Sequence, residues 1–394
     1  MKLRLLESVR CVGCRARLKL EGPTLRRVER AMGGALASCA GVCPFPELMG
    51  TTRDCLACSE HEVTEGCLVC VSCGRRYPIR GGVPRFWDPE RSWMNDATAR
   101  TASSFGYLWN RTSVMEPSHG PQPYHVDRMA QALSLEPPHG LVLDAGCGEG
   151  IDLANQAHRG VEIIGVELSE GGCRVSVERS LPFRTASVLQ GDLCQLPFDD
   201  DWFDVIFSYG VLHHLVSPAR GLRELVRVLK PGGRITVYLY EDFRERARGW
   251  RWLLRVVSAM RRVTTRLSPT LLYRLCQLGS PVVFLTFTVP FKVSRWLAVR
   301  SCGSVLNLPF RHATGPFSLA RDLFDRFSAP IERRYSREAA VALLQGTGLQ
   351  DVKVVWDRGW MVAGLKPTRA ATKPCEKDWP DAAPEVREGR EAAC

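Results

Sequence analysis

Acidic residues are absent from a long part of this sequence. Between Arg246 and Arg321 there is no Asp or Glu, although thirteen Lys and Arg residues fall in that stretch. The whole chain has 53 Lys and Arg against 42 Asp and Glu, so this segment accounts for more than the net charge of +11. Such a basic stretch suits anionic partners, for example RNA or a lipid surface.

A leader segment and a clear membrane span are missing as well. The opening MKLRLLESVRC has no apolar core of about 7 to 15 residues and no small-residue cleavage site. The uncharged run from Leu275 to Phe291 has 17 residues, whereas a transmembrane helix needs about 20 apolar residues. Pro281 and Pro290 also interrupt this run. We therefore expect a cytoplasmic protein in which residues 244–311 form a basic, apolar helical insertion, with peripheral contact to an anionic membrane surface as an open alternative.

Cysteine is abundant, but its spacing does not favour disulfides. Nine of the 16 cysteines precede residue 74, and several form C-x2-C pairs, which is metal-site spacing. Cys11 with Cys14, and Cys70 with Cys73, can each give two thiolates to a tetrahedral Zn²⁺. Four thiolates leave no open position, so this zinc would be structural.

Two alternatives remain for the metal ligands. Cys55 and Cys58 form another C-x2-C pair that lies closer to Cys70 and competes with Cys11 and Cys14. Cys39 and Cys43 could join the pair that is left over in a second site. The other cysteines are expected to be small buried apolar side chains, and this applies to Cys173, Cys194, Cys276 and Cys302.

From Gly140 to Tyr240, apolar strands alternate with amphipathic helices. Strands are expected in LVLDAG, IIGVEL, SVLQGD, FDVIFSYG and RITVYLY, and the Pro-Gly-Gly after Lys230 is expected to end the preceding helix. This alternation predicts βαβ units and a parallel sheet. After Arg321 the helical SREAAVALLQGTGLQ and the extended DVKVVWDRG predict the last elements of the same sheet.

Three carboxylates follow the expected strands of this region. Asp144 precedes glycines at 146, 148 and 150, which let the backbone turn tightly and approach a ligand at a helix N-terminus. Glu167 ends the second strand, where an acidic side chain accepts hydrogen bonds from ribose hydroxyls. Asp192 follows the third strand and is placed to meet an adenine amino group. Together they predict a cofactor that contains adenosine.

The motifs D-x-G-x-G-x-G, V-E-L-S, G-D-x-x-x-L-P-F, L-H-H and L-K-P-G-G follow one another in this order. Over residues 140–240 they resemble the type 11 branch of the class I S-adenosylmethionine-dependent methyltransferases. The resemblance implies that Asp144 and the glycine loop hold the methionine part of the cofactor, and that Glu167 holds the ribose. The cofactor-binding residues implied in this way are Asp144, Ala145, Gly146, Cys147, Gly148, Glu167, Leu168, Asp192, Leu193 and Ser208.

A second resemblance lies near the N-terminus. The text EVTEGCLVCVSCGRRYPIRGGVPRF, together with RCVGCRARLKL, resembles the zinc-ribbon domain called Trm112p-like. The resemblance implies Cys11, Cys14, Cys70 and Cys73 as the zinc ligands. Two features depart from the usual form of that family, because Val12 replaces a proline and the stretch between the two cysteine pairs is unusually long.

A general base is optional for methyl transfer, because the sulfonium of S-adenosylmethionine is already activated. In VLHHL, after the fourth strand, His213 and His214 lie near the expected position of the methyl acceptor. A histidine with a pKa near 6.5 can take a proton from the acceptor. We name His213 as the candidate catalytic residue, the alternative being a histidine that only hydrogen-bonds the loop.

The predicted fold is α/β, a Rossmann-like class I methyltransferase sheet with helices on both faces. A small zinc-ribbon-like module and a helical insertion are added to it. The connector contains SFGYLWNR, whose aromatic residues either form a lid over the cofactor or pack on the core. The expected boundaries are 1–86 for the module, 87–138 for the connector, 139–243 with 312–367 for the catalytic domain, 244–311 for the insertion, and 368–394 for a disordered tail.

The predicted function is transfer of a methyl group from S-adenosylmethionine to a small-molecule or lipid-like acceptor. The first alternative is methylation of a base in rRNA or tRNA, because a zinc ribbon fused to this catalytic fold occurs in enzymes that methylate ribosomal RNA. The second is a regulatory subunit that binds the cofactor without activity, which the intact set of carboxylates and glycines disfavours. The sequence does not indicate the acceptor atom or the oligomeric state.

Overall fold

The computed structural model describes residues 1–28, 60–87, 96–112, 124–246, 248–301, 310 and 313–368. Four cysteines considered above as zinc ligands lie outside these ranges, namely Cys39, Cys43, Cys55 and Cys58. The predicted tail also lies outside them, except for its first residue, Thr368.

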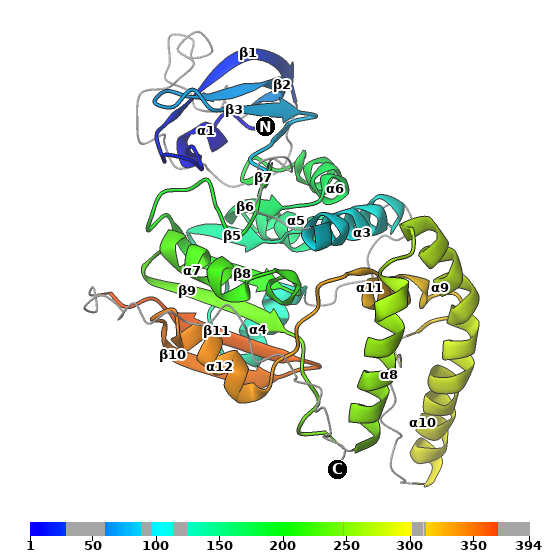
Figure 1. Cartoon of the computed structure of the whole chain (residues 1–394). Helices are drawn as coiled ribbons and strands as arrows, with labels where there is room; N and C mark the ends of the chain where they lie inside the picture. Colours follow the sequence, from blue (N-terminus) through cyan, green and yellow to red (C-terminus); the bar gives the residue numbers. More distant parts are fainter. Residues whose placement is uncertain are drawn as a thin grey trace, which may run out of the picture.

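The centre of the molecule is a seven-stranded sheet with the strand order β10-β11-β9-β8-β5-β6-β7 (Figure 1). Strands β5 to β9 run parallel to one another, and β11 runs antiparallel between β9 and β10. This sheet confirms the predicted α/β fold. Its strands are β5 (Leu141–Ala145), β6 (Glu162–Glu167), β7 (Ala186–Gln190), β8 (Phe203–Tyr209), β9 (Leu229–Leu239), β10 (Gln350–Trp356) and β11 (Trp360–Leu365).

Helices cover both faces of the sheet. Consecutive side chains of a strand point to opposite faces, so each face of the sheet presents apolar side chains that a helix layer buries. Val142 packs in one apolar cluster with residues of α4 (His125–Ala132) and α5 (Ile151–His158). Leu143 packs in another cluster with residues of α7 (Pro218–Val228) and α12 (Arg337–Gln345). A further helix, α6 (Glu170–Ser180), packs against α5, and its N-terminus is capped by the Ser169 side chain.

The N-terminal module contains a short helix and a four-stranded antiparallel sheet. The elements are α1 (Leu5–Ser8), β1 (Leu18–Arg27), β2 (His61–Cys70), β3 (Arg76–Arg80) and β4 (Val83–Pro84). The module packs on the edge of the central sheet. Arg85 forms a parallel bridge with Gln190 of the edge strand β7, and Val9 forms an antiparallel bridge with Phe198. Apolar residues of both parts belong to one buried cluster, so the module covers a sheet edge that would otherwise be exposed.

The insertion consists of long helices at one side of the sheet (Figure 1). They are α8 (Arg248–Thr264), α9 (Pro269–Val283), the π-helical segment η3 (Phe284–Thr288) and α10 (Val289–Ser301). The chain returns through α11 (Ala320–Ser328), which packs against α8 and α9. The connector helix α3 (Asp96–Thr112) contacts α11 and α6.

Two expectations about helix ends were wrong. Pro281 and Pro290 do not interrupt the run, since α9, η3 and α10 follow one another without a break. Pro290 cannot donate a hydrogen bond to the carbonyl of Thr286, and its ring crowds that carbonyl. The wider π-helical turn of η3, which contains Thr286, accommodates this. The Pro-Gly-Gly after Lys230 does not end α7 either, because α7 stops at Val228 and these residues belong to β9.

Candidate active site

The carboxyl ends of the parallel strands form the candidate site. Strands β5 and β8 are neighbours although two strands separate them in the sequence, and a crevice for a ligand opens at such a switch point. Asp144 lies near the end of β5, Glu167 ends β6, and Asp192 follows β7. On β8, the Ser208 hydroxyl donates a hydrogen bond of 2.8 Å to the carbonyl of Ala145. The structure therefore brings the predicted carboxylates to one edge of the sheet.

The glycine loop between β5 and α5 needs its glycines. Gly146 has a φ of +89°, and a Cβ atom there would lie 2.3 Å from the Val211 side chain. Gly148 has a φ of +52°, and a Cβ atom there would lie 3.2 Å from the Trp109 ring. Any side chain at these positions would strain the backbone and collide with a neighbour. The rest of the loop is buried, including Ala145 and Cys147.

The Glu167 carboxylate is held in a fixed position. Its Oε2 accepts a hydrogen bond of 3.1 Å from the backbone N–H of Gly148. Its Oε1 accepts from the backbone and the hydroxyl of Ser169, at 2.8 and 2.6 Å. Oε2 therefore keeps one lone pair for a ribose hydroxyl, whereas Oε1 already accepts two hydrogen bonds. Burial raises the pKa of this carboxyl, although these donors oppose the shift.

The Asp144 carboxylate is buried and accepts no hydrogen bond within the described part of the chain. Burial raises its pKa well above the ordinary value, and the nearby charges of Asp152 and Glu167 raise it further. Burial also raises the pKa of Asp192, whose Oδ1 accepts a hydrogen bond of 2.9 Å from the N–H of Cys194. A buried acid without a cationic partner among the described residues, as Asp144 is, suits a ligand with positive charge, such as a sulfonium or an ammonium group.

The other predicted cofactor residues lie along the same edge. The Leu168 carbonyl accepts a hydrogen bond of 2.8 Å from the side chain of Gln190. Leu193 is buried in the apolar cluster beside the sheet. The thiol of Cys147 lies 3.6 Å from the Ser176 hydroxyl, and burial raises its pKa well above the ordinary value. This cysteine is therefore a neutral packing group and not a nucleophile.

Helix α3 lies over the glycine loop. The Trp109 ring contacts Gly148, and the guanidinium of Arg321 lies 5.2 Å from the centre of that ring. Arg321 also forms an ion pair with Glu149, a buried loop residue that pairs with Arg179 as well. The sequence prediction missed Glu149 and Arg321. Glu149 lies inside the glycine motif, but its distant partner could not be known without the fold.

On the acceptor side, aromatic rings surround two buried histidines. His213 belongs to the 3-10 segment η2 (Leu212–His214) and is fully buried, with its ring 3.8 Å from that of Tyr240. Neither of its ring nitrogens has a hydrogen-bond partner among the described residues. The ring of His214 makes an edge contact with Phe105 at 5.1 Å, and its Nδ1 lies 2.6 Å from the carbonyl of Ile331.

Both histidines are weak bases. Burial lowers the pKa of His213 well below 6.5, and the neighbouring His214 lowers it further. Burial also lowers the pKa of His214 to about 4, although the carbonyl of Ile331 opposes the shift. Both rings are therefore neutral at physiological pH and can accept a proton only from a good acid.

The four predicted zinc ligands come together in the N-terminal module. Their sulfur atoms all lie within 4.8 Å of one another. Cys11 Sγ is 3.5 Å from Cys73 Sγ, and Cys14 Sγ is 3.4 Å from Cys70 Sγ. A tetrahedron with Zn–S bonds of about 2.3 Å has sulfurs about 3.8 Å apart. The donor set and the spacing fit a structural Zn²⁺.

Backbone N–H groups lower the pKa of two cysteines in this cluster. Burial acts to raise the pKa of Cys70, but the N–H groups of Cys73 and Ser72 outweigh it and lower the pKa to about 6. Cys11 has a lowered pKa as well, because the hydroxyl of Tyr77 and nearby backbone donors outweigh its burial. The Cys70 thiolate is thus available at neutral pH, as zinc binding requires. The backbone N–H of Arg75 acts to lower the pKa of Cys73, but hydrogen bonds with Cys70 and Cys11 outweigh it and raise the pKa to about 11.

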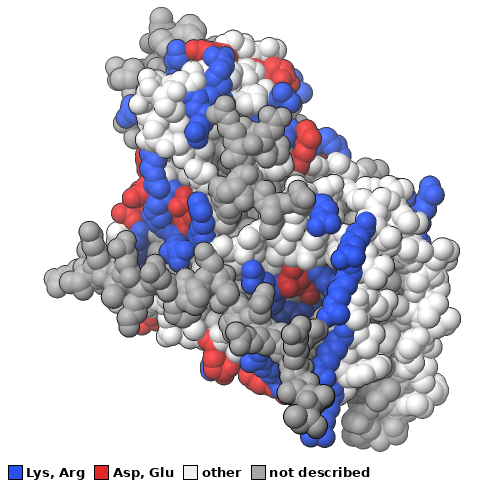
Figure 2. Space-filling model, in the orientation of Figure 1, with Lys and Arg blue, Asp and Glu red and all other residues white. Residues whose placement is uncertain are grey.

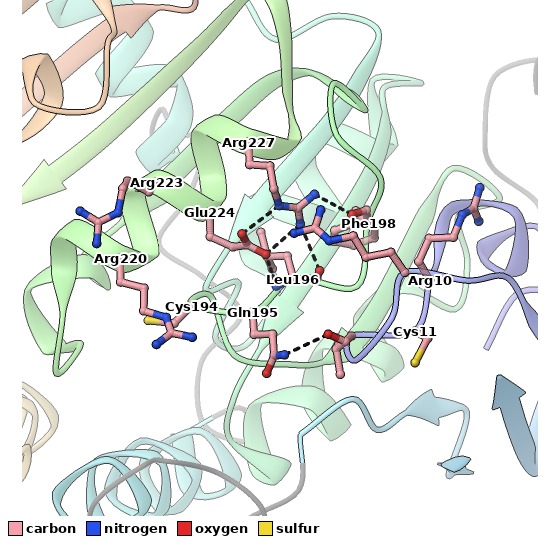
Figure 3. Close-up of a pocket in the computed structure, with 12 residues that line it drawn as sticks. Arg10, Cys11, Cys194, Gln195, Leu196, Phe198, Arg220, Arg223, Glu224 and Arg227 are labelled. Atoms are coloured by element: carbon pink, nitrogen blue, oxygen red, sulfur yellow. Dashed lines mark hydrogen bonds and ion pairs between the residues drawn. The ribbon is translucent and has the colours of Figure 1, made fainter. Parts of the chain in front are cut away.

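A cavity of about 550 Å³ lies where the module meets the catalytic domain (Figure 3). Arg227 connects other residues that line the cavity, since its guanidinium donates to the carbonyl of Phe198 at 2.9 Å and pairs with Glu224 at 2.8 Å. The side chain of Gln195 donates to the carbonyl of Val12 at 3.0 Å. The cavity is lined by five arginines, namely Arg10, Arg15, Arg220, Arg223 and Arg227.

The fold and the site define a class I methyltransferase domain, with the adenosine-binding carboxylates at the strand ends and a thiolate module on the edge of the sheet. Residues 143–237 match the family of methyltransferase domains, and residues 2–82 match the family of Trm112p-like proteins. These matches confirm the predicted methyltransferase domain and its Trm112p-like module. They also support S-adenosylmethionine as the cofactor of this domain.

Two curated relatives each match less than a third of this chain. Demethylmenaquinone methyltransferase of Clavibacter sepedonicus is 38% identical over 112 residues, which are 28% of this chain and 45% of that protein. "Probable tRNA methyltransferase 9B" of Homo sapiens is 34% identical over 116 residues, 29% of this chain and 24% of that protein. The chain thus spans less than half of the length of either relative.

A solved structure covers more of the chain. It belongs to the complex between the Haloferax volcanii Trm112 methyltransferase activator and its methyltransferase. The similarity covers 69% of this chain and 100% of that chain, at 17% identity and a TM-score of 0.38.

Proposed function

We propose that this protein is a cytoplasmic S-adenosylmethionine-dependent methyltransferase whose acceptor is a small, lipid-like molecule. One observation carries the proposal. The side of the site where the acceptor would lie is lined by aromatic rings and by two histidines that burial keeps neutral. An apolar acceptor loses little on entering such a site.

The residues of the chain have separate tasks in this reaction. Asp144 accepts hydrogen bonds from the ammonium group of the methionine part, Glu167 holds the ribose hydroxyls, and Asp192 meets the adenine. When bound, the cofactor supplies an electrophilic methyl group that needs no further activation. Helix α3, held over the glycine loop by Trp109 and Arg321, excludes water. Orientation and exclusion of water are the main contributions that such a transfer needs from the protein.

The relatives are compatible with this acceptor class. The Clavibacter sepedonicus relative is named for demethylmenaquinone, a ring with an apolar tail.

An RNA acceptor is the second candidate, and the arginine-lined cavity is the observation that favours it. The Homo sapiens relative is named for tRNA. Against this candidate, several of the arginines already have acidic partners. Arg10 pairs with Asp199, and both Arg15 and Arg227 pair with Asp200, each at 2.7 Å. These pairs leave less positive charge for a phosphate backbone than the arginine count indicates.

Methyl transfer from radiolabelled S-adenosylmethionine tests the proposal. The purified protein is incubated with the lipid extract and, separately, with the total RNA of cells that lack it. We expect label in the lipid fraction, abolished by Asp144→Asn. Label in RNA instead, with binding that weakens steeply as salt rises, would favour the second candidate. Cofactor binding without transfer to either fraction would indicate a regulatory subunit.

A further inference from the structure

The helical insertion has one face fixed to the protein. On the helix formed by α9, η3 and α10, the side chains of Leu272, Tyr273 and Cys276 are buried in a cluster with α11 and α3. The Ser280 hydroxyl donates a hydrogen bond of 2.6 Å to the carbonyl of Pro316, and the Thr288 hydroxyl donates one of 2.8 Å to that of Phe310. These contacts anchor the inner face of the helix, so its outer face is held in a defined orientation.

The outer face of this helix is apolar and open to solvent. Leu278 is 74% exposed, and Val282 and Leu285 are each 64% exposed. Their spacing of four and three residues places them in one row along the helix. The row continues in both directions with other exposed apolar residues, namely Leu271, Leu275, Val293, Trp296 and Leu297. A soluble monomer rarely exposes so long an apolar row, which marks an interaction surface.

Basic side chains flank this apolar row. Arg274 lies at one end of the uncharged stretch, and Lys292 and Arg295 lie at the other. A second basic row follows α8, where exposed arginines recur at helical spacing. They are Arg248, Arg251, Arg255, Arg262 and Arg266. Figure 2 shows basic side chains along the position of α8, next to a largely uncharged surface over α9 and α10.

The central arginines of α8 lack acidic partners in the described part of the chain. Neither Arg251 nor Arg255 forms an ion pair with a carboxylate there. The sequence itself has no Asp or Glu between Arg246 and Arg321. Apolar side chains beside a row of arginines complement a surface that is apolar inside and anionic outside, which is the surface of an anionic bilayer.

We propose that α8 and the α9–α10 helix dock on an anionic lipid bilayer, with the row around Leu278 in the acyl boundary and the arginines of α8 among the headgroups. This inference goes beyond the proposed function, because it does not depend on the identity of the acceptor. It identifies the surface from which a lipid-like acceptor would approach helix α3 and the cofactor.

Other occupants fit the surface less well. A second copy of this chain would bring the same arginines face to face, with no acid on that surface to pair with them. Pro269–Ala298 is long and apolar enough to cross a membrane by length and composition alone. A span would pull the inner face away from α11 and expose the Ser280 and Thr288 hydroxyls to hydrocarbon. Docking in the plane of the bilayer keeps those contacts.

Flotation of the full-length, zinc-loaded protein with vesicles tests the docking. We expect flotation with phosphatidylcholine vesicles that contain phosphatidylglycerol, and little with phosphatidylcholine alone. Arg251→Glu with Arg255→Glu should weaken the partition by about tenfold or more. Leu278→Glu with Leu285→Glu should abolish it, whereas Val355→Glu, at an exposed apolar position of the distant β10, should leave it unchanged.

The controls separate docking from folding and from catalysis. Calorimetric binding of S-adenosylhomocysteine must be the same in all variants, which shows that they fold. Protein that stays in solution with anionic vesicles, or double variants that still float, would overturn the proposal. A dimer that Leu278→Glu with Leu285→Glu dissociates would also overturn it, because the surface would then belong to self-association. Vesicle binding without any methyl transfer would count against the proposed function and not against docking.

Discussion

At the scale of single residues, Asp144 is the group whose charge the cofactor should change most. Its carboxyl is buried, lacks a hydrogen-bond partner among the described residues and has a raised pKa because burial disfavours its charge. A cationic ligand stabilises the ionised form, so binding should release a proton, and affinity should rise as pH increases through the raised pKa. Calorimetry in buffers of different ionisation enthalpy measures this release.

The variant Asp144→Asn keeps the shape of the side chain and removes the charge. We expect S-adenosylmethionine to bind at least about tenfold more weakly, because a hydrogen bond to a charged group contributes roughly 1.5–3 kcal/mol. The proton release should disappear with it. Asp351→Asn, at an exposed position of β10, is the matched control. An unchanged affinity in Asp144→Asn would remove this residue from the site.

The two buried histidines predict an unusual pH profile. The pKa of His213 lies well below 6.5 and that of His214 at about 4, chiefly because burial disfavours the charged ring. Both stay neutral as pH falls from 8 to 6, so kcat should not show a decline centred near 6.5. His213→Ala should lower kcat with little loss of cofactor affinity. A profile that falls by half near pH 6.5 would mean that another, exposed base controls the reaction.

The choice between cysteine pairs can be decided by metal content. Cys11 and Cys14 lie with Cys70 and Cys73 in one cluster, whereas Cys55 and Cys58 lie outside the described residues. The double variant Cys11→Ser with Cys14→Ser should lose the zinc, because two thiolates cannot hold a tetrahedral site. The double variant Cys55→Ser with Cys58→Ser should keep the zinc at the wild-type level. The reverse result would show that the alternative pair provides the ligands.

At the scale of elements, the sequence was informative where residues act through their own strand or loop. Asp144, Glu167 and Asp192 were predictable because each follows an apolar strand, and parallel strands end at one edge of a sheet. The predicted end of α7 lies too far along the chain. In the structure Leu229 pairs with Phe203 and joins the sheet before the proline is reached. Pairing of this kind depends on a partner strand that periodicity does not reveal.

The helix over the cofactor loop illustrates the same limit. From the sequence alone, the aromatic residues of SFGYLWNR could either form a lid or pack on the core. The structure contains contacts of both kinds. Tyr107 packs against Tyr273 of α9 and Phe324 of α11, while Trp109 contacts the glycine loop at Gly148. Neither partner is near in the sequence. The tertiary fold therefore decides which face of α3 covers the cofactor.

Arg321 should control how firmly this helix covers the loop. It pairs with Glu149 and lies over the Trp109 ring, so Arg321→Ala loosens both contacts. Because the arginine is partly exposed and Glu149 keeps Arg179, we expect only about two- to tenfold weaker cofactor binding. Titration calorimetry measures the change, with Arg337→Ala on the exposed side of α12 as the control. Equal affinity in both variants would leave α3 without a role in binding.

At the scale of the whole molecule, the N-terminal module and the catalytic domain are joined by backbone hydrogen bonds and by a shared apolar cluster. The sequence predicted the module and the sheet separately, and nothing in it indicated how they meet. In the structure the backbone N–H of Arg10 donates to the carbonyl of Pro197, and that of Phe86 donates to the carbonyl of Gln190, both at 2.8 Å. Cys11 and Cys70 belong to the same buried cluster as Phe198. Cys11 of the metal site also lines the same cavity as Cys194, Gln195 and Leu196, which follow Asp192.

Removing the zinc should therefore unfold more than the module. Without a cation the thiolates of this cluster repel one another, and zinc binding contributes about 10–16 kcal/mol in zinc-finger peptides, as much as a whole domain's stability. A chelator should lower the temperature of a single unfolding transition in calorimetry and weaken binding of S-adenosylhomocysteine together with it. The alternative outcome is a separate low-temperature transition with cofactor affinity intact. It would show that the module unfolds alone and that the shared cluster does not couple the two sites.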